Sequence, residues 1–246
     1  MEIILNLFNI GYLFQHIGTI LQIRKIERKK STEGVCIDTL VLFLIGALCR
    51  VIWINDTELR LFWITYLELT MAFITLFYSL YLCLFKYNNM LTFFEGLNRT
   101  EILVFLRWYV ILVISAILAY FFYPGNDSDN SHWFDLQMLV SLSIYCEAGG
   151  LLPQIYITNK EKDSNNFSRL YLVFLSISRV LRLLFWFKLF IEDNGFVFLI
   201  IADLIHCFML SGFVYSFFSN LNNFSLPQTI DSKSQSKRNQ RMTKLC

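Results

Sequence analysis

The segment SRLYLVFLSISRVLRLLFWFKLFI, residues 168–191, carries two arginines, Arg179 and Arg182, inside an otherwise apolar run. About 20 helical residues cross a hydrocarbon core of about 30 Å, so this run is long enough to span a membrane. A guanidinium at that depth is costly unless it is paired or faces water. The segment therefore predicts a transmembrane helix that faces carboxylates or a polar cavity.

Six further stretches have similar length and apolarity. The chain of 246 residues is 56% hydrophobic and only 16% charged, which is too apolar for a soluble domain. The runs are too long and too uniformly apolar for barrel strands, so they are predicted to be helices. We expect an all-α membrane protein with seven transmembrane helices, at about 3–21, 36–54, 59–85, 101–123, 132–157, 168–191 and 196–219.

Basic residues fall mostly on one side of this arrangement, which by the positive-inside rule is the cytosolic side. The N-terminus is then luminal and the C-terminus cytosolic. Sequons at Asn55 and Asn126 lie on the luminal side, in short turns that disfavour glycosylation. The basic residues of the cytosolic side are Arg24, Lys25, Arg28, Lys29, Lys30, Lys86, Arg99, Lys160, Lys162, Arg169, Lys233, Lys237, Arg238, Arg241 and Lys244.

A short repeat divides the chain. Gln22-Ile23 ends the first span and Gln154-Ile155 ends the fifth, and each is followed by a basic connector and a span with an arginine. We predict a domain over 1–221 made of two parallel three-helix repeats, about 3–85 and 132–219, joined by a linker helix, about 101–123. The repeats are related by an axis along the membrane normal. A chance match of a Gln-Ile pair is the alternative. A basic cytosolic tail, 222–246, follows.

The charges inside the spans form two predicted layers. At 1.5 Å per residue, Glu147 and Arg179 both lie about 15 Å from the cytosolic end of their spans, so they can pair. Arg50 and Arg182 lie about 21 Å from that end and are predicted to open toward the lumen. Trp186 shares a helix stripe with both arginines of its span. Alternatively, every arginine is paired internally and only holds the bundle together.

Other chemistry is sparse. The chain has no paired cysteines at metal spacing, no HExxH and no Ser/His/Asp constellation, which argues against an enzyme, a metal site or another cofactor. Nothing in it indicates nucleic-acid binding. His16, near the middle of the first span, is a candidate pH sensor or else a hydrogen-bonded packing residue. Lys233, Lys237 and Arg238 form a candidate cytosolic trafficking signal that binds coat protein or anionic lipid, or else a tail without a partner.

The segment SIYCEAGGLLPQI, residues 143–155, resembles the fifth-helix signature of the KDEL receptors, which retrieve escaped residents of the endoplasmic reticulum (ER). The resemblance continues from Tyr171 to Trp186, through Gly34-Val35-Cys36 to Arg50, and to Leu226-Pro227, so that it covers about residues 5–227. It implies seven helices in two triplets. Residues 29–35 also resemble the wider PQ-loop superfamily, which includes sugar and amino-acid transporters.

The resemblance implies roles for individual residues. Arg50 would receive the C-terminal carboxylate of a KDEL-like tetrapeptide on a luminal protein, which suits a bidentate guanidinium. Trp186 would pack on the peptide, and Arg182 would replace a lost cationic contact. Glu147 and Arg179 would be an internal pair that changes partners on binding. The implied location is the membrane of the ER and early Golgi, with retrograde coat proteins and membrane lipids as partners.

This chain departs from the family pattern at several positions. Phe8 stands where the family has an arginine, Trp53 where it has an aspartate, and Gln137 where it has the acid that contacts the peptide's lysine. The loss of that acid implies a tetrapeptide with a different first residue. The alternative function is a PQ-loop-type transporter of a small anionic solute, which the buried charges and Pro153 would serve equally well.

Overall fold

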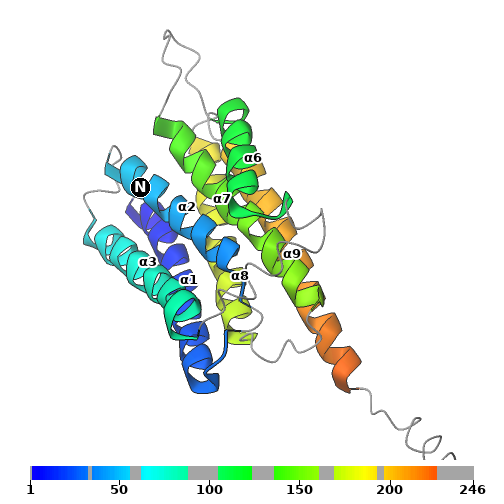
Figure 1. Cartoon of the computed structure of the whole chain (residues 1–246). Coiled ribbons are helices and arrows are strands. Elements are labelled where there is room, and N and C mark those ends of the chain that lie inside the picture. The colour runs from blue at the N-terminus through cyan, green and yellow to red at the C-terminus, as the bar shows by residue number, and fades with distance from the viewer. Residues whose placement is uncertain are drawn as a thin grey trace, which may run out of the picture.

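The fold is a bundle of α-helices. The computed structural model describes residues 2–32, 35–55, 62–87, 105–123, 136–160, 169–192 and 197–225, and all of its regular elements are helical, as predicted (Figure 1). The α-helices within these ranges are α1 (Glu2–Lys29), α2 (Ile37–Asn55), α3 (Trp63–Tyr81), α6 (Trp108–Phe121), α7 (Leu136–Lys160), α8 (Arg169–Glu192) and α9 (Val197–Ser225). A π-helical turn, η2 (Leu82–Lys86), continues α3.

Five helices are long and apolar enough to cross a membrane. Within the described residues, these segments are Ile37–Asn55, Trp63–Lys86, Gln137–Ile157, Leu170–Ile191 and Val197–Tyr215. The apolar helix α6 has 14 residues and is shorter than a typical span. Helix α1 has 28 residues but a lower mean hydropathy, because its last turns are basic. The prediction of a multispanning membrane protein is thus supported by these five segments.

Several helix boundaries differ from the prediction. Helix α9 continues to Ser225. Helix α1 continues to Lys29, so Arg24, Lys25, Arg28 and Lys29 lie on the helix and not in a connector. Helix α6 begins at Trp108, and residues 101–104 of the predicted span lie outside the described ranges. Arg107, which lies within the predicted span of about 101–123, is extended and precedes the helix. The Asp38 carboxylate accepts the N–H of Trp108 over 3.1 Å, which satisfies an open donor at the helix start.

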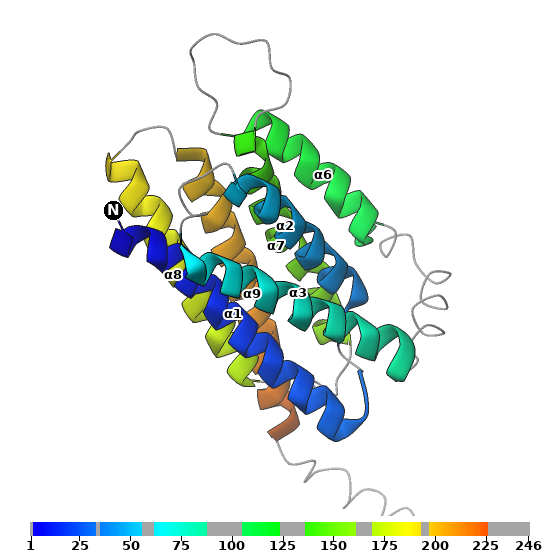
Figure 2. The same ribbon diagram turned by 90° about the vertical axis from the view of Figure 1, so that its left-hand side faces the viewer.

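Two pairs of helices form the centre of the bundle. Helix α1 packs along α8, and α2 packs along α7. Figure 2 shows α1 beside α8 on one flank, with α6 on the opposite flank next to α2 and α7.

Glycines make both contacts close. A Cβ on Gly11 would lie 2.8 Å from Cγ of Arg182, and one on Gly46 would lie 3.3 Å from Cγ of Glu147. The backbones of α1 and α2 therefore approach the charged residues of α8 and α7 directly.

Candidate functional site

Three arginines and three carboxylates meet inside the bundle. They come from five different helices, and each side chain is at most 1% exposed. The charges balance, which is the arrangement that makes buried ions tolerable in a membrane. The members of this ionic network are Arg50 of α2, Glu68 of α3, Glu147 of α7, Arg179 and Arg182 of α8, and Asp203 of α9.

Glu147 links the two arginines of α8. Its Oε2 accepts hydrogen bonds of 2.8 Å from Nη2 of Arg179 and 2.8 Å from Nη1 of Arg182. The predicted contact between Glu147 and Arg179 is present. The two arginines lie three residues apart on one face of α8, so a single carboxylate reaches both. Charge-assisted bonds of this kind are short and strong.

Arg50 has a carboxylate partner on the neighbouring helix. Its Nη1 lies 2.6 Å from Oε1 of Glu68, and Nε2 of His16 lies 3.0 Å from the same oxygen. Its Nε lies 3.8 Å from Oε1 of Glu147, too far for a hydrogen bond. Within the described part of the chain, Arg50 and Arg182 are each 1% exposed, because Glu68 and Glu147 contact them and aromatic rings lie against them, so the predicted opening is not seen there.

Helix α1 contributes three residues that contact the ionic network. The sequence analysis did not identify Tyr12 and Gln15, and it left the role of His16 open. Cζ of Arg50 lies 3.5 Å from the centroid of the Tyr12 ring, and Cζ of Arg182 lies 4.2 Å from it. Both cations therefore lie against one π-system. Oε1 of Gln15 accepts a bond of 3.3 Å from Arg179, and His16 faces Glu68. Tyr12, Gln15 and His16 follow an i, i+3, i+4 spacing, which places them on one helix face and could have identified them from the sequence.

Five aromatic residues pack directly over the network. We call them the aromatic cap: Phe8, Tyr12, Trp53, Phe185 and Trp186. Phe185 and Trp186 have ring centroids 4.7 Å apart, and the ring of Trp53 lies 6.5 Å from that of Trp186. Trp186 thus lies one turn beyond Arg182, as its sequence position predicted, but within a closed aromatic cluster.

The network is less completely bonded on the side of α9. Oδ1 of Asp203 lies 3.5 Å from Nη2 of Arg182 and 3.7 Å from Nη1 of Arg179, and neither Asp203 oxygen makes a hydrogen bond in the described part of the chain. His206, one turn further along α9, is buried and both of its ring nitrogens lack a hydrogen bond there as well. Asp203 is therefore close enough to attract both arginines without holding either one tightly.

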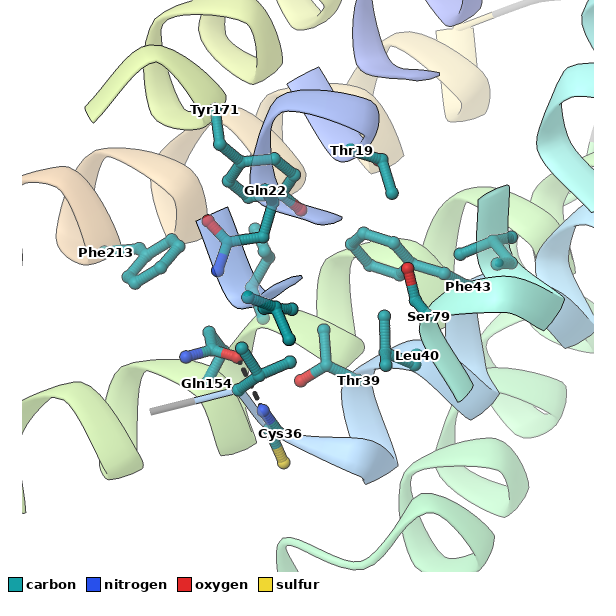
Figure 3. Close-up of a pocket in the computed structure, with 14 residues that line it drawn as sticks. Thr19, Gln22, Cys36, Thr39, Leu40, Phe43, Ser79, Gln154, Tyr171 and Phe213 are labelled. Atoms are coloured by element: carbon teal, nitrogen blue, oxygen red, sulfur yellow. Dashed lines mark hydrogen bonds between the residues drawn. The ribbon is translucent and has the colours of Figure 1, made fainter. Parts of the chain in front are cut away.

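A small cavity lies on the other side of the network. Its volume is about 30 Å³, enough for about two water molecules. Gln22 and Gln154, the paired glutamines of the sequence repeat, both line it, together with Thr39 and Tyr171 (Figure 3). Oε1 of Gln154 accepts the N–H of Cys36 over 3.0 Å at the start of α2. The cavity is too small for a peptide or a metabolite in this conformation.

The structure therefore brings together all the candidate site residues of the spans: His16, Arg50, Glu147, Arg179, Arg182 and Trp186. Asn55 is the last residue of α2. The candidate trafficking residues Lys233, Lys237 and Arg238, and the sequon at Asn126, lie outside the described residues.

Comparison with known proteins identifies the family of the chain. A family model described as "ER lumen protein retaining receptor" matches residues 31–188. This range includes five of the six residues of the ionic network, all but Asp203. The chain is 24% identical over 217 residues to the ER lumen protein-retaining receptor erd-2.2 of Caenorhabditis elegans, covering 86% of this chain and 92% of that protein. It is 24% identical over 220 residues to the ER lumen protein-retaining receptor of Plasmodium falciparum, covering 87% and 92%.

A mammalian relative matches less of the chain. ER lumen protein-retaining receptor 3 of Mus musculus is 22% identical over 191 residues, which is 77% of this chain and 81% of that protein. The family match begins after α1 and extends into α8, so it includes all of α2 and α7, one of the two helix pairs at the centre of the bundle. The chain belongs to the ER lumen protein-retaining receptor family.

Proposed function

We propose that this protein retrieves escaped ER proteins by binding a C-terminal tetrapeptide in the Golgi and returning its cargo to the ER in retrograde vesicles. It belongs to a family of receptors and is not an enzyme. The observation that carries the proposal is the pair of guanidiniums on the Tyr12 ring. Nε of Arg50, and Nε and Nη2 of Arg182, are buried donors without a hydrogen bond among the described residues. A peptide carboxylate supplies the acceptors that these donors lack.

Binding requires the internal pairs to rearrange. The carboxylate of the ligand competes with Glu68 for Arg50, and Glu68 then keeps its contact with His16 on its other side. Arg179 has a second carboxylate available, because Asp203 lies 3.7 Å from its Nη1 while Glu147 holds its Nη2. An exchange of Arg179 from Glu147 to Asp203 would leave Glu147 bonded to Arg182 alone. Trp186 would pack on a side chain of the peptide.

Orientation and repeats belong to the same proposal. The N-terminus is luminal and the C-terminus cytosolic, and α1 to α3 form one repeat and α7 to α9 the other. An axis that exchanges α1 with α7 and α2 with α8 also exchanges the contact α1·α8 with the contact α7·α2, and these are the two main helix contacts. The positions of Gln22 and Gln154 around one cavity support the same axis. Lys233, Lys237 and Arg238 would engage retrograde coat protein or anionic lipid.

The test is binding of a library of C-terminal peptides to the purified full-length protein at pH of about 5.5 and about 7.2. We expect binding that depends on a free carboxylate and is lost in Arg50→Ala. Arg50→Lys keeps the charge but not the bidentate geometry and should bind weakly. Lys86→Ala removes an exposed cation outside the network and should bind normally. The absence of binding by every peptide at both pH values would contradict the proposal.

One observation favours a second candidate, the transport of a small anionic solute. The cavity at Gln22 and Gln154 lies on the opposite side of the network from the aromatic cap, as a second entrance would. Uptake of radiolabelled small carboxylates into proteoliposomes tests this function. Accumulation that is lost in Arg182→Gln, without any peptide binding, would favour a transporter over a receptor.

A further inference from the structure

The aromatic cap determines which peptide the site accepts. Resting on the proposed function, we propose that the preferred ligand is a peptide with a free C-terminal carboxylate and apolar, aromatic-rich residues before its last position. The carboxylate lies at Arg50 and Arg182, and the preceding residues lie among the rings. The cap, the charges around it and its unpaired polar atoms each support this assignment.

The cap is a continuous set of ring contacts centred on Phe8. The ring centroid of Phe8 lies 5.0 Å from that of Tyr12, 5.8 Å from Trp53, 5.1 Å from Phe185 and 5.8 Å from Trp186. Distances of this size are those at which aromatic pairs attract one another. Tyr12 belongs both to the cap and to the cation–π contacts of the arginines, so the apolar and ionic parts of the site share a wall.

Among the described residues, the buried carboxylates next to the cap are those of the ionic network, and each already faces a guanidinium: Glu68 faces Arg50, Glu147 faces Arg179 and Arg182, and Asp203 faces Arg182. Apart from these, the helix segments on the cap side contain one charged residue whose side chain the structure describes, Lys188, and it is exposed. A lysine of the ligand would have to compete with the arginines for a carboxylate, and otherwise its desolvation would be uncompensated. These segments are 6–11, 51–55, 62–67, 137–146, 183–191 and 197–202.

Among the buried polar atoms of the cap-side segments that lack hydrogen bonds to described residues, one donor and one acceptor are complementary to a peptide group. Nε1 of Trp53 is a donor on a side chain 6% exposed, and Oδ1 of Asn9 is an acceptor on a side chain 0% exposed. The Nδ2 of Asn9 is already used, because it donates to Thr65 over 2.8 Å. A peptide backbone supplies a carbonyl for the indole N–H and an amide N–H for Asn9.

The same atoms distinguish a peptide from a small aromatic acid. An aromatic acid satisfies the guanidiniums and the rings but has no series of amide groups for Trp53 and Asn9. The closed cap must part to admit any ligand, which breaks the ring contacts of Phe8. Apolar side chains of a peptide replace those contacts with new apolar contacts to the rings. Hydrophilic side chains would instead place polar groups against the rings.

Binding to the full-length protein in nanodiscs tests the inference with two octapeptides that share a free C-terminal leucine. One ends in Phe-Tyr-Val-Leu and the other in Lys-Asp-Glu-Leu. We expect the aromatic peptide to bind at least about tenfold more tightly, the gain of burying one more apolar side chain. Its C-terminal amide should not bind. N-acetylphenylalanine, the small aromatic acid, should bind at least about tenfold more weakly than the aromatic peptide.

Trp53 variants test the role of the cap. Trp53→Phe keeps a ring but removes the N–H, and should lower the affinity for the aromatic peptide about fivefold. Trp63→Phe, at a tryptophan that is 75% exposed, is the matched control and should leave binding unchanged. Trp53→Asp supplies a carboxylate to the cap and should reverse the preference. Thermal melting reports whether each variant is folded, and the comparison of peptides on the unmodified protein needs no variant.

The outcomes separate this inference from the function on which it rests. If the Lys-Asp-Glu-Leu peptide binds as tightly as the aromatic one, the inference is wrong and the receptor function stands. If no peptide binds, both are wrong. If N-acetylphenylalanine binds as tightly as the aromatic peptide, the ligand is a small aromatic acid and not a peptide. Unchanged affinity in Trp53→Phe would show that the indole N–H does not bind the ligand.

Discussion

Arg50 and Glu68 form the shortest ion pair among the described residues, with Nη1 of Arg50 2.6 Å from Oε1 of Glu68 and both side chains buried. The pair joins α2 to α3, two consecutive antiparallel helices, and His16 shares the carboxylate from α1. Because three helices meet at one carboxylate, this contact couples a proposed ligand-binding arginine to the packing of the first half of the bundle.

Glu68→Gln should therefore destabilise the protein strongly. It leaves Arg50 as a buried cation with only the 3.8 Å contact to Glu147, and breaking a buried ion pair costs about 3–5 kcal/mol. The midpoint of thermal unfolding in detergent measures the loss. The double variant Arg50→Leu with Glu68→Leu should recover much of it. Glu27→Gln, whose partner Lys86 is exposed, is the control, and an equal loss there would contradict the argument.

Glu147 and Asp203 should contribute unequally, although both face the arginines of α8. Glu147→Gln removes the charge from two bonds of 2.8 Å and should cost about 3–5 kcal/mol. Asp203→Asn alters contacts of 3.5 and 3.7 Å that are not hydrogen bonds, and should cost about 1–2 kcal/mol. Unfolding midpoints of the two variants, compared in the same detergent, test the order. A larger loss for Asp203→Asn would mean that Asp203 is a main anchor of Arg179 and Arg182.

Gly11→Ala should destabilise the bundle, whereas Gly212→Ala should not. A Cβ at position 11 would lie 2.8 Å from Cγ of Arg182 and 3.2 Å from the backbone oxygen of Ser178, so α1 and α8 would have to separate. Overpacking of this kind costs about 1–3 kcal/mol. A Cβ at position 212 meets nothing within 4 Å, and alanine favours a helix over glycine by about 1 kcal/mol. Unfolding midpoints of the two variants test the contrast; equal values would mean that the close contact of α1 with α8 is absent.

The helical class could be predicted from the sequence, since hydropathy and run length decide whether a segment can satisfy its backbone in lipid. The contact between Glu147 and Arg179 could be predicted too, because both lie at similar depths on neighbouring spans and a buried cation needs a partner. The start of α6 could not be predicted from the sequence. Asp38, 70 residues away in the chain, accepts a hydrogen bond from the N–H of Trp108 at the start of this helix, and a hydropathy profile contains no information about such a bond.

The partner of Arg50 also escaped prediction, because depth along a helix says nothing about rotation around it. Glu68 is on a different helix from Arg50, and its Oε1 accepts a bond of 2.6 Å from Nη1 of Arg50. The aromatic residues at positions 8 and 53 read individually as apolar surface or core, and their closure over the arginines depends on three helices coming together.

The amino-acid sequence alone indicates that Arg50, Glu147, Arg179 and Arg182 lie at membrane depth, since composition and spacing along each helix set that depth. Which carboxylate bonds which guanidinium, and which rings cover them, follows from how the helices are rotated and packed. Close contacts at Gly11 and Gly46 set that packing, and they join residues far apart in the chain, so no local pattern records it.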